Sequence, residues 1–103
     1  AYGRTAPGSR VAAAYRTLSL AAHETKRAMV GLDALLLPTA PQQPFLHGTT
    51  PPANQADFTA LANIAGLPAV AFPLPTSDLP LSAQLIGPAF AEGRLIALAQ
   101  ALS

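Results

Sequence analysis

The side chains of this chain that could carry out chemistry are few, and they do not form a known catalytic pattern. No serine lies in a Gly-x-Ser-x-Gly turn, which would expose a nucleophile. Lys26 is the only lysine, and it falls on the polar side of a predicted helix, where it stays solvated and unsuited to catalysis. The five carboxylates are not spaced as metal ligands and cysteine is absent, so we expect no catalytic residue, no metal and no cofactor.

Four polar side chains occupy positions where they could contact either a ligand or the protein's own backbone. His47 lies in a proline-rich segment, where a histidine either contacts a substrate or is merely exposed. Asp57 either belongs to the start of a helix, which we favour, or contacts a substrate. Asn63 and Gln84 lie within apolar stretches, where a buried amide must be hydrogen-bonded. Each amide either ties its element to a loop such as Pro38-Thr39, which we favour, or shapes a binding channel.

The elements that must position these side chains follow from the spacing of apolar residues. Residues 1–9 have the composition of a loop, and a helix with one apolar stripe is predicted over about 10–30, ended by Gly31. The continuous apolar run 32–37 is typical of a strand buried on both faces. The five prolines within 38–52 forbid regular structure, and loops of this length are often functional.

The second half of the sequence predicts a helix, a hairpin and a closing helix. Asn54 is expected to start a helix that Gly66 terminates in the left-handed conformation. Two short apolar strands, 69–74 and 81–86, flank a proline-containing turn, and the last helix covers about 89–102. The order helix, strand, helix, strand, strand, helix predicts helices packed on a partial mixed sheet, an α/β architecture.

The composition does not suit a small domain that is stable by itself. Of 103 residues half are apolar and only 11% are charged, against about 25% in typical soluble domains. A chain of this size buries only about 60–65% of its unfolded surface, so much apolar surface would stay exposed. The three predicted strands would also leave open sheet edges. We therefore expect a covering partner or, preferably, a piece of a larger protein, and the start at Ala1 without methionine agrees with the latter.

The charge and the hydropathy of the sequence imply neither a nucleic-acid partner nor a membrane partner. The net charge of +1, with dispersed basic residues, implies no contact with nucleic acid or with an anionic membrane. No apolar run approaches the ~20 residues that a membrane span requires, and no signal peptide is visible. We therefore expect a cytoplasmic protein without a membrane contact.

Four blocks of the sequence, in this order, resemble the C-terminal part of the amidase-signature family. They are DALLLPT (33–39), DFTALANIAGLPAVAFP (57–73), LPLSAQLIG (79–87) and Phe90-x-Glu92. Together they cover nearly the whole chain. The resemblance implies that residues 1–103 are a single partial domain, the C-terminal segment of a larger α/β/α sandwich.

Enzymes of that family hydrolyse amides, or transfer the ammonia that they release, with a Ser–Ser–Lys triad. The motif that carries the triad has no match here, so no catalytic residue carries over. The resemblance implies that Thr39, His47 and Asp57 line a channel for a small amide substrate, while Asn63, Gly66 and Gln84 are structural. It also implies that the chain is inactive alone, and that its partner is the remainder of the amidase chain or a companion chain.

The alternative is a non-enzymatic α/β interaction module that binds a partner through its apolar surface. The behaviour of the chain in solution distinguishes the two hypotheses, because a module would be folded and monodisperse while a segment would aggregate or fold poorly.

Overall fold

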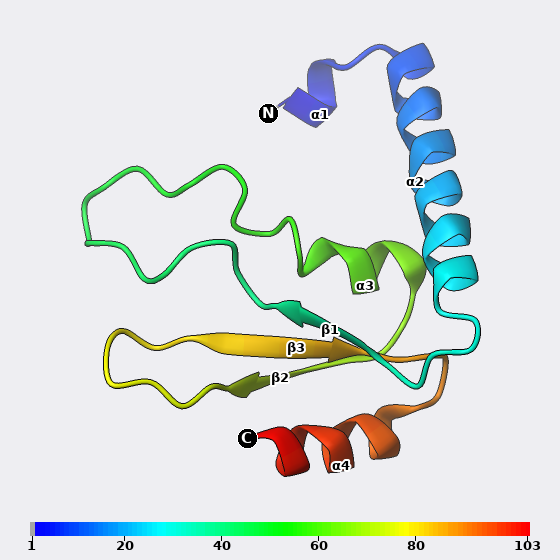
Figure 1. The fold of residues 1–103 in the computed structure, drawn as a ribbon. Helices are drawn as coiled ribbons and strands as arrows, with labels where there is room; N and C mark the ends of the chain where they lie inside the picture. Colours follow the sequence, from blue (N-terminus) through cyan, green and yellow to red (C-terminus); the bar gives the residue numbers. More distant parts are fainter. Residues whose placement is uncertain (1) are drawn as a thin grey trace.

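A computed structural model describes residues 2–103, which form four helices and three strands (Figure 1). Their order is α1 (Tyr2–Thr5), α2 (Gly8–Ala28), β1 (Leu35–Pro38), α3 (Ala60–Ala65), β2 (Ala69–Pro73), β3 (Ser82–Ile86) and α4 (Glu92–Leu102). The predicted α/β class and the predicted order of elements are confirmed. The short helix α1 is an addition, because it lies in a stretch predicted to be a loop.

The three strands form one sheet in the order β1-β3-β2, and both pairings are antiparallel. The short connection between β2 and β3 requires antiparallel pairing, since a parallel crossover needs a dozen or more residues. Strands β1 and β2 run in the same direction but are separated by β3, so no parallel pair forms within residues 2–103. The sheet of this stretch is therefore antiparallel rather than mixed.

Strand β1 is an edge strand, and the prediction that it would be buried on both faces is wrong. Its residues alternate between half-buried and exposed, and Leu36 is 57% exposed. The cause is the position of α4, which packs over β2 and β3 and leaves the β1 side of the sheet uncovered. The apolar side chains of this strand are thus only partly covered by the other described residues.

The core lies between the sheet and α4. Side chains on one face of β2 and β3 pack against the inner face of α4, and the cluster consists of Phe72, Ala83, Leu85, Leu95 and Ala99. The register places Val70 opposite Leu85 and Phe72 opposite Ala83, which keeps these side chains on one face. Leu95 is fully buried, so this helix residue is central to the packing of the layer.

Gln84 points to the opposite face of the sheet, because side chains alternate along a strand. It is only 4% exposed, and its Nε2 donates hydrogen bonds to the backbone oxygens of Phe58 (2.9 Å) and Pro38 (3.3 Å). Pro38 ends β1, and Phe58 lies just before α3. One buried amide therefore holds both ends of the long loop that joins these elements.

Helix α3 begins six residues later than predicted, at Ala60 instead of Asn54. The Asn54 side chain does not cap the helix, because its Oδ1 accepts a hydrogen bond from Gln42 Nε2 across the loop. Residues 53–59 form turns instead. The predicted end is observed: Gly66 has φ 67°, and its N–H reaches the carbonyl oxygens of Ala62 and Asn63.

Helix α4 also begins later than predicted, at Glu92, because the backbone before it is not helical. Phe90 has φ 65°, a left-handed conformation that is uncommon for a bulky residue and that ends any helix there. Phe90 is accordingly 94% exposed, whereas Leu95, inside the helix, occupies its buried face.

Helix α2 starts two residues before its predicted start and extends away from the rest of the molecule (Figure 1). Only its C-terminal end is covered, where α2 packs on α3 and buries Thr25 and Met29. The predicted apolar stripe continues along the uncovered half, where Tyr15 is 68% exposed. No helix among residues 2–103 is long and apolar enough to cross a membrane.

The molecule is flat and open for its length. Its extents are 46 × 42 × 17 Å, and its radius of gyration is 16.3 Å, against about 13 Å for a compact domain of this length. Its accessible surface of 7451 Å² also exceeds the about 5400 Å² expected for a compact monomer of this mass. The described residues thus form a thin slab with two large uncovered faces.

Gly87 provides a sharp test of the packing around α4. A Cβ atom at Gly87 would lie 2.9 Å from Leu95 Cδ2 and 3.1 Å from its Cγ, so the fully buried Leu95 side chain would have to shift. We expect Gly87→Ala to lower the free energy of unfolding by about 1–3 kcal/mol. The matched control is Gly93→Ala in α4, because nothing lies within 4 Å of a Cβ atom there. This substitution should raise the free energy of unfolding by about 0.4–1 kcal/mol. Urea unfolding measures both, and equal effects would contradict the described packing.

Gln84 provides a test of the loop anchor. Gln84→Leu leaves two carbonyl oxygens without their donor, so we expect a loss of about 1–3 kcal/mol in the free energy of unfolding.

Gln84→Glu should lower the free energy of unfolding further at neutral pH, because burial beside two carbonyl oxygens raises the pKa of the new carboxyl above its unfolded value. Its stability should then be greatest below about pH 4 and fall as pH rises through the folded pKa. Denaturation at several pH values measures this, and a pH-independent Gln84→Glu would contradict the burial.

Candidate functional site

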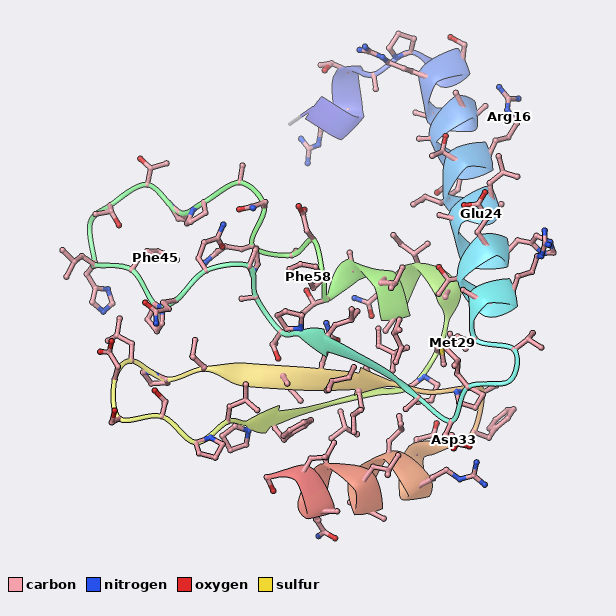
Figure 2. The ribbon with its side chains drawn as sticks, in the orientation of Figure 1. Arg16, Glu24, Met29, Asp33, Phe45 and Phe58 are labelled. Carbon is pink, nitrogen blue, oxygen red and sulfur yellow. The ribbon has the colours of Figure 1, made fainter. Side chains whose placement is uncertain are left out.

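The segment between β1 and α3 is the long loop on which the candidate residues lie. Figure 2 shows Phe45 on its outer part and Phe58 where it reaches α3. Several hydrogen bonds order it besides the Gln84 anchor. Among them, the Gln42–Asn54 bond joins its two arms, Thr39 N–H donates to Ser82 O (3.1 Å), and Asp57 N–H donates to Asn54 O (3.1 Å). The loop thus has a defined conformation although it contains no helix or strand.

Thr39 is the predicted contact residue with the most unusual environment. The residue is half-buried at the end of β1, and its Oγ1 is buried without a hydrogen-bond partner among residues 2–103. A buried hydroxyl oxygen without a partner is costly in a folded protein. A group outside the described residues, such as a ligand or further polypeptide, would satisfy it.

The other two predicted contact residues are exposed. His47 lies on the outer part of the loop and Asp57 in the turns before α3, and both are open to solvent. No hydrogen bond or ion pair connects Thr39, His47 and Asp57 in the stretch that the structure describes. The three residues therefore share one loop without forming a joined cluster.

The two amides that we expected to be buried differ. Gln84 is buried and bonded to the ends of the loop, one of which is Pro38. Asn63 is exposed, and its predicted burial is wrong. The physical reason lies in α3, which buries Ala62 and Ala65 and turns Asn63 outward between them. Gly66 lies at the end of the same helix in its left-handed conformation.

Gln42 is a residue that sequence reasoning missed. Its Nε2 is bonded to Asn54, whereas its Oε1 is buried and has no partner among the described residues. Gln42 also lines a surface cavity of about 230 Å³ together with Gln55, Leu81 and Ser82. No sequence signal identifies it, because two adjacent glutamines before a proline are ordinary in an exposed loop.

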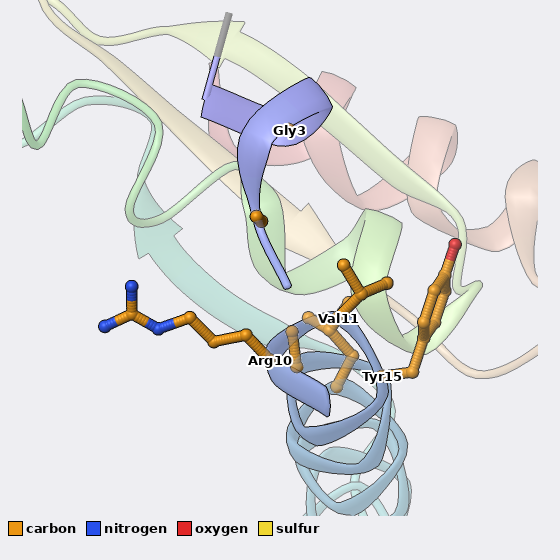
Figure 3. Close-up of a pocket in the computed structure, with 7 residues that line it drawn as sticks. Gly3, Arg10, Val11 and Tyr15 are labelled. Atoms are coloured by element: carbon orange, nitrogen blue, oxygen red, sulfur yellow. The ribbon is translucent and has the colours of Figure 1, made fainter. Parts of the chain in front are cut away.

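Other clefts on the described residues are mainly apolar, and two of them lie beside the elements already described. One, of about 540 Å³, lies on the α4 side of the sheet beside Leu36, Phe72 and Leu102. The other, of about 310 Å³, lies between α1 and α2, and Figure 3 shows Gly3 on α1 near Val11 and Tyr15 on α2. Both clefts continue the uncovered faces of the slab.

The described residues hold no assembled reaction centre. Within residues 2–103 no three His, Cys, Asp or Glu side chains gather at a metal-binding distance. The ion pair between Arg94 and Asp33, at 3.6 Å, is exposed and contributes little to stability.

Comparison with known proteins identifies what the chain is similar to. The family model described as Amidase matches residues 3–96. One subunit of the glutamyl-tRNA(Gln) amidotransferase from Granulibacter bethesdensis is 42% identical over 96 residues, covering 86% of this chain and 19% of that protein. The same subunit from Salinibacter ruber is 36% identical over 98 residues, with the same coverage.

A solved structure agrees with these relatives. The crystal structure of the same amidotransferase subunit from Thermotoga maritima matches with a TM-score of 0.81 and 32% identity, covering 90% of this chain and 22% of that one. The chain therefore spans about a fifth of the length of the relatives it matches. Since the family model covers more than nine tenths of the sequence, the resemblance seen in its four blocks is confirmed, and the chain belongs to the amidase family.

Proposed function

We propose that this chain is the C-terminal segment of an amidase-family enzyme that breaks an amide carbon–nitrogen bond. In this proposal it supplies strands, helices and one wall of the substrate channel, and it is inactive alone. The Ser–Ser–Lys residues belong to a part of the enzyme outside this stretch. The observation that carries the proposal is the match itself, which covers nearly all of this chain but only 19–22% of its relatives.

The excess surface supports a large partner rather than a small one. The accessible surface of 7451 Å² is about 2000 Å² more than a compact monomer of this mass exposes. A standard protein–protein interface buries only about 800 Å² on each partner. The area to be covered is thus closer to that of a domain interior, as expected if the remainder of the same polypeptide packs on both faces.

The distribution of exposed apolar side chains supports the same conclusion. Leu36 on the sheet edge, Tyr15 on α2 and Phe90 before α4 are 57%, 68% and 94% exposed, and they lie on different parts of the slab. Large apolar patches on several sides are unusual for a monomer in solution. A single docking partner would cover one of them, whereas surrounding layers of a sandwich would cover all three.

Two reactions remain within the proposal. The released ammonia either leaves as a hydrolysis product or passes to an acceptor on a companion chain, as the amidotransferase names of the relatives suggest.

We also propose that Thr39, His47 and Asp57 contact the substrate, a small amide. Thr39 has the best support, because its buried Oγ1 lacks a partner within the described residues. The cytoplasmic location expected from the sequence is part of the same proposal.

The first test compares the 103-residue chain with the complete polypeptide that contains it. We expect ammonia release from a panel of primary amides by the complete polypeptide, and no release by the chain alone, because the chain lacks a matched triad. We also expect the isolated chain to aggregate or to bind a hydrophobic dye, since its apolar faces are uncovered. Size-exclusion chromatography and dye fluorescence measure this aggregation. Because the isolated chain is expected to aggregate, the stability of the Gly87 and Gln84 variants is to be measured in the complete polypeptide.

Two results would contradict the proposal. Robust amide turnover by the isolated chain would place the catalytic residues within it. A monodisperse isolated chain that unfolds cooperatively, together with a complete polypeptide that releases no ammonia, would favour the interaction module instead. A Ser→Ala scan of the isolated chain is the control for contaminating activity.

The second test examines Thr39 in the complete polypeptide. Thr39→Val has nearly the same shape but lacks the oxygen, so a substrate contact predicts a KM about fivefold to tenfold higher with little change in stability. Thr39→Ser keeps the oxygen and is the matched control. An unchanged KM together with a raised melting temperature in Thr39→Val would show that the hydroxyl has no ligand, because removing an unsatisfied buried group stabilises a fold.

A further inference from the structure

We infer that the basic face of α2 docks an acidic helical segment of a second polypeptide. The basic face consists of five exposed residues, Arg16, Ser19, His23, Lys26 and Arg27. The proposed function makes no use of this surface. The inference rests on that function only for what covers the apolar stripe of the same helix.

Charge is divided unevenly between two parts of the molecule. Residues 2–28, which contain α1 and α2, hold five of the six basic residues and one of the five carboxylates, so their net charge is +4 with histidine neutral. Residues 29–103 hold the other four carboxylates and one arginine, so their net charge is −3. The overall charge of +1 therefore conceals a positive arm, residues 2–28, attached to a negative body, residues 29–103.

The fold of α2 gathers the charges of this arm into a row. The first four members of the basic face are three or four residues apart, so they follow one side of the helix, and Arg27 lies next to Lys26. Figure 2 shows Arg16 extending from α2 away from the rest of the molecule. From Arg16 to Arg27 the row is about 16 Å long, at a rise of 1.5 Å per residue. A helix thus holds these side chains at fixed spacing.

The chain itself does not neutralise the permanent cations of this face. Within residues 2–103 none of Arg16, Lys26 and Arg27 forms an ion pair with a carboxylate. In the proposed function the remainder of the polypeptide covers the apolar stripe of α2, which includes Val11 and Leu18. Burying unpaired charges there would be costly. The basic face is therefore left on the surface of the complete enzyme.

A hollow on this face offers the partner a second kind of contact. A cleft of about 410 Å³ is lined by Tyr15, Arg16, Ser19 and Leu20. Leu20 is 64% exposed, so it has no cover of its own. An apolar side chain of the partner would pack between Tyr15 and Leu20, while carboxylates one turn away would pair with Arg16 and Arg27. This lining fits a helix with glutamates or aspartates at three- and four-residue spacing and one apolar side chain.

The amount of charge favours a protein partner over a membrane or a nucleic acid. The basic face holds three lysine and arginine residues, fewer than the about four to eight that bind anionic lipids. The sequence pI of 8.5 is below the about 9 that is typical of nucleic-acid-binding domains. The negative body would also repel a long polyanion. A short acidic segment pairs with the row and does not extend over the body.

The experiment uses the complete polypeptide and a fluorescent helical peptide as the probe. The peptide carries glutamates at alternating three- and four-residue spacing with one leucine between them. We expect fluorescence anisotropy to show binding at about 50 mM salt that weakens about tenfold at about 500 mM, because salt screens exposed charge pairs. A scrambled peptide of the same composition, with its glutamates on all sides, should bind about fivefold more weakly.

Charge reversal locates the binding on α2. Arg27→Glu should weaken peptide binding about tenfold without changing the melting temperature, because the residue is exposed. The matched control is Arg94→Glu, the same change at an exposed position of α4, which should alter binding by about twofold at most. The double variant Arg16→Glu/Arg27→Glu should lose the acidic peptide and bind a peptide with lysines in place of the glutamates.

Four results would overturn the inference. They are no binding of the acidic peptide, equal binding of the ordered and scrambled peptides, equal effects of Arg27→Glu and Arg94→Glu, and tighter binding of single-stranded RNA or of phosphatidylserine vesicles than of the peptide. Amide turnover without peptide binding would overturn the docking face and leave the proposed function. Peptide binding that Arg27→Glu weakens, in a complete polypeptide that releases no ammonia, would overturn the proposed function and support the docking face.

Discussion

The buried amide of Gln84 is the contact on which the rest of this structure depends. It lies on the central strand β3, and its two hydrogen bonds reach Pro38 and Phe58, the residues on either side of a long loop without helix or strand. Ordering such a loop costs conformational entropy. Fixing its two ends lowers this cost, because fewer conformations remain open to the chain between them. A leucine at this position would pack equally well, but it would leave two carbonyl oxygens unbonded and the loop ends unattached. The polar residue in the apolar strand therefore links the core to the candidate site.

The uncovered faces follow from the same small core. The described residues bury one apolar cluster between the sheet and α4, and a second smaller contact between α2 and α3. Neither is large enough to draw Leu36, Tyr15 or Phe90 inside, so the slab remains 17 Å thick. Low charge, open sheet edges and unmatched apolar stripes are thus three aspects of one condition, in which the sequence carries the apolar residues of a larger core than it can close alone.

The parts that could be predicted from sequence are those that local physics determines. The hairpin strands are found within one residue of their predicted bounds, and Gly66 ends α3 in the left-handed conformation that few other residues adopt easily. The start of α3 could not be predicted, because Asn54 bonds to Gln42 twelve residues away and not to the helix beside it. Asn63 and Gln84 are similar amides in similar apolar stretches, and only the packing of α3 decides which one is exposed.

The candidate site shows the same division between local and distant causes. The sequence places its candidate residues on the proline-rich loop, which stays a prediction. The environment of Thr39 and Gln42 could not be predicted, since both unpartnered oxygens depend on how the loop folds back on itself. In the proposed function this loop belongs to the wall of a substrate channel, which orients the substrate, and the bond-breaking groups are proposed to lie on another part of the polypeptide.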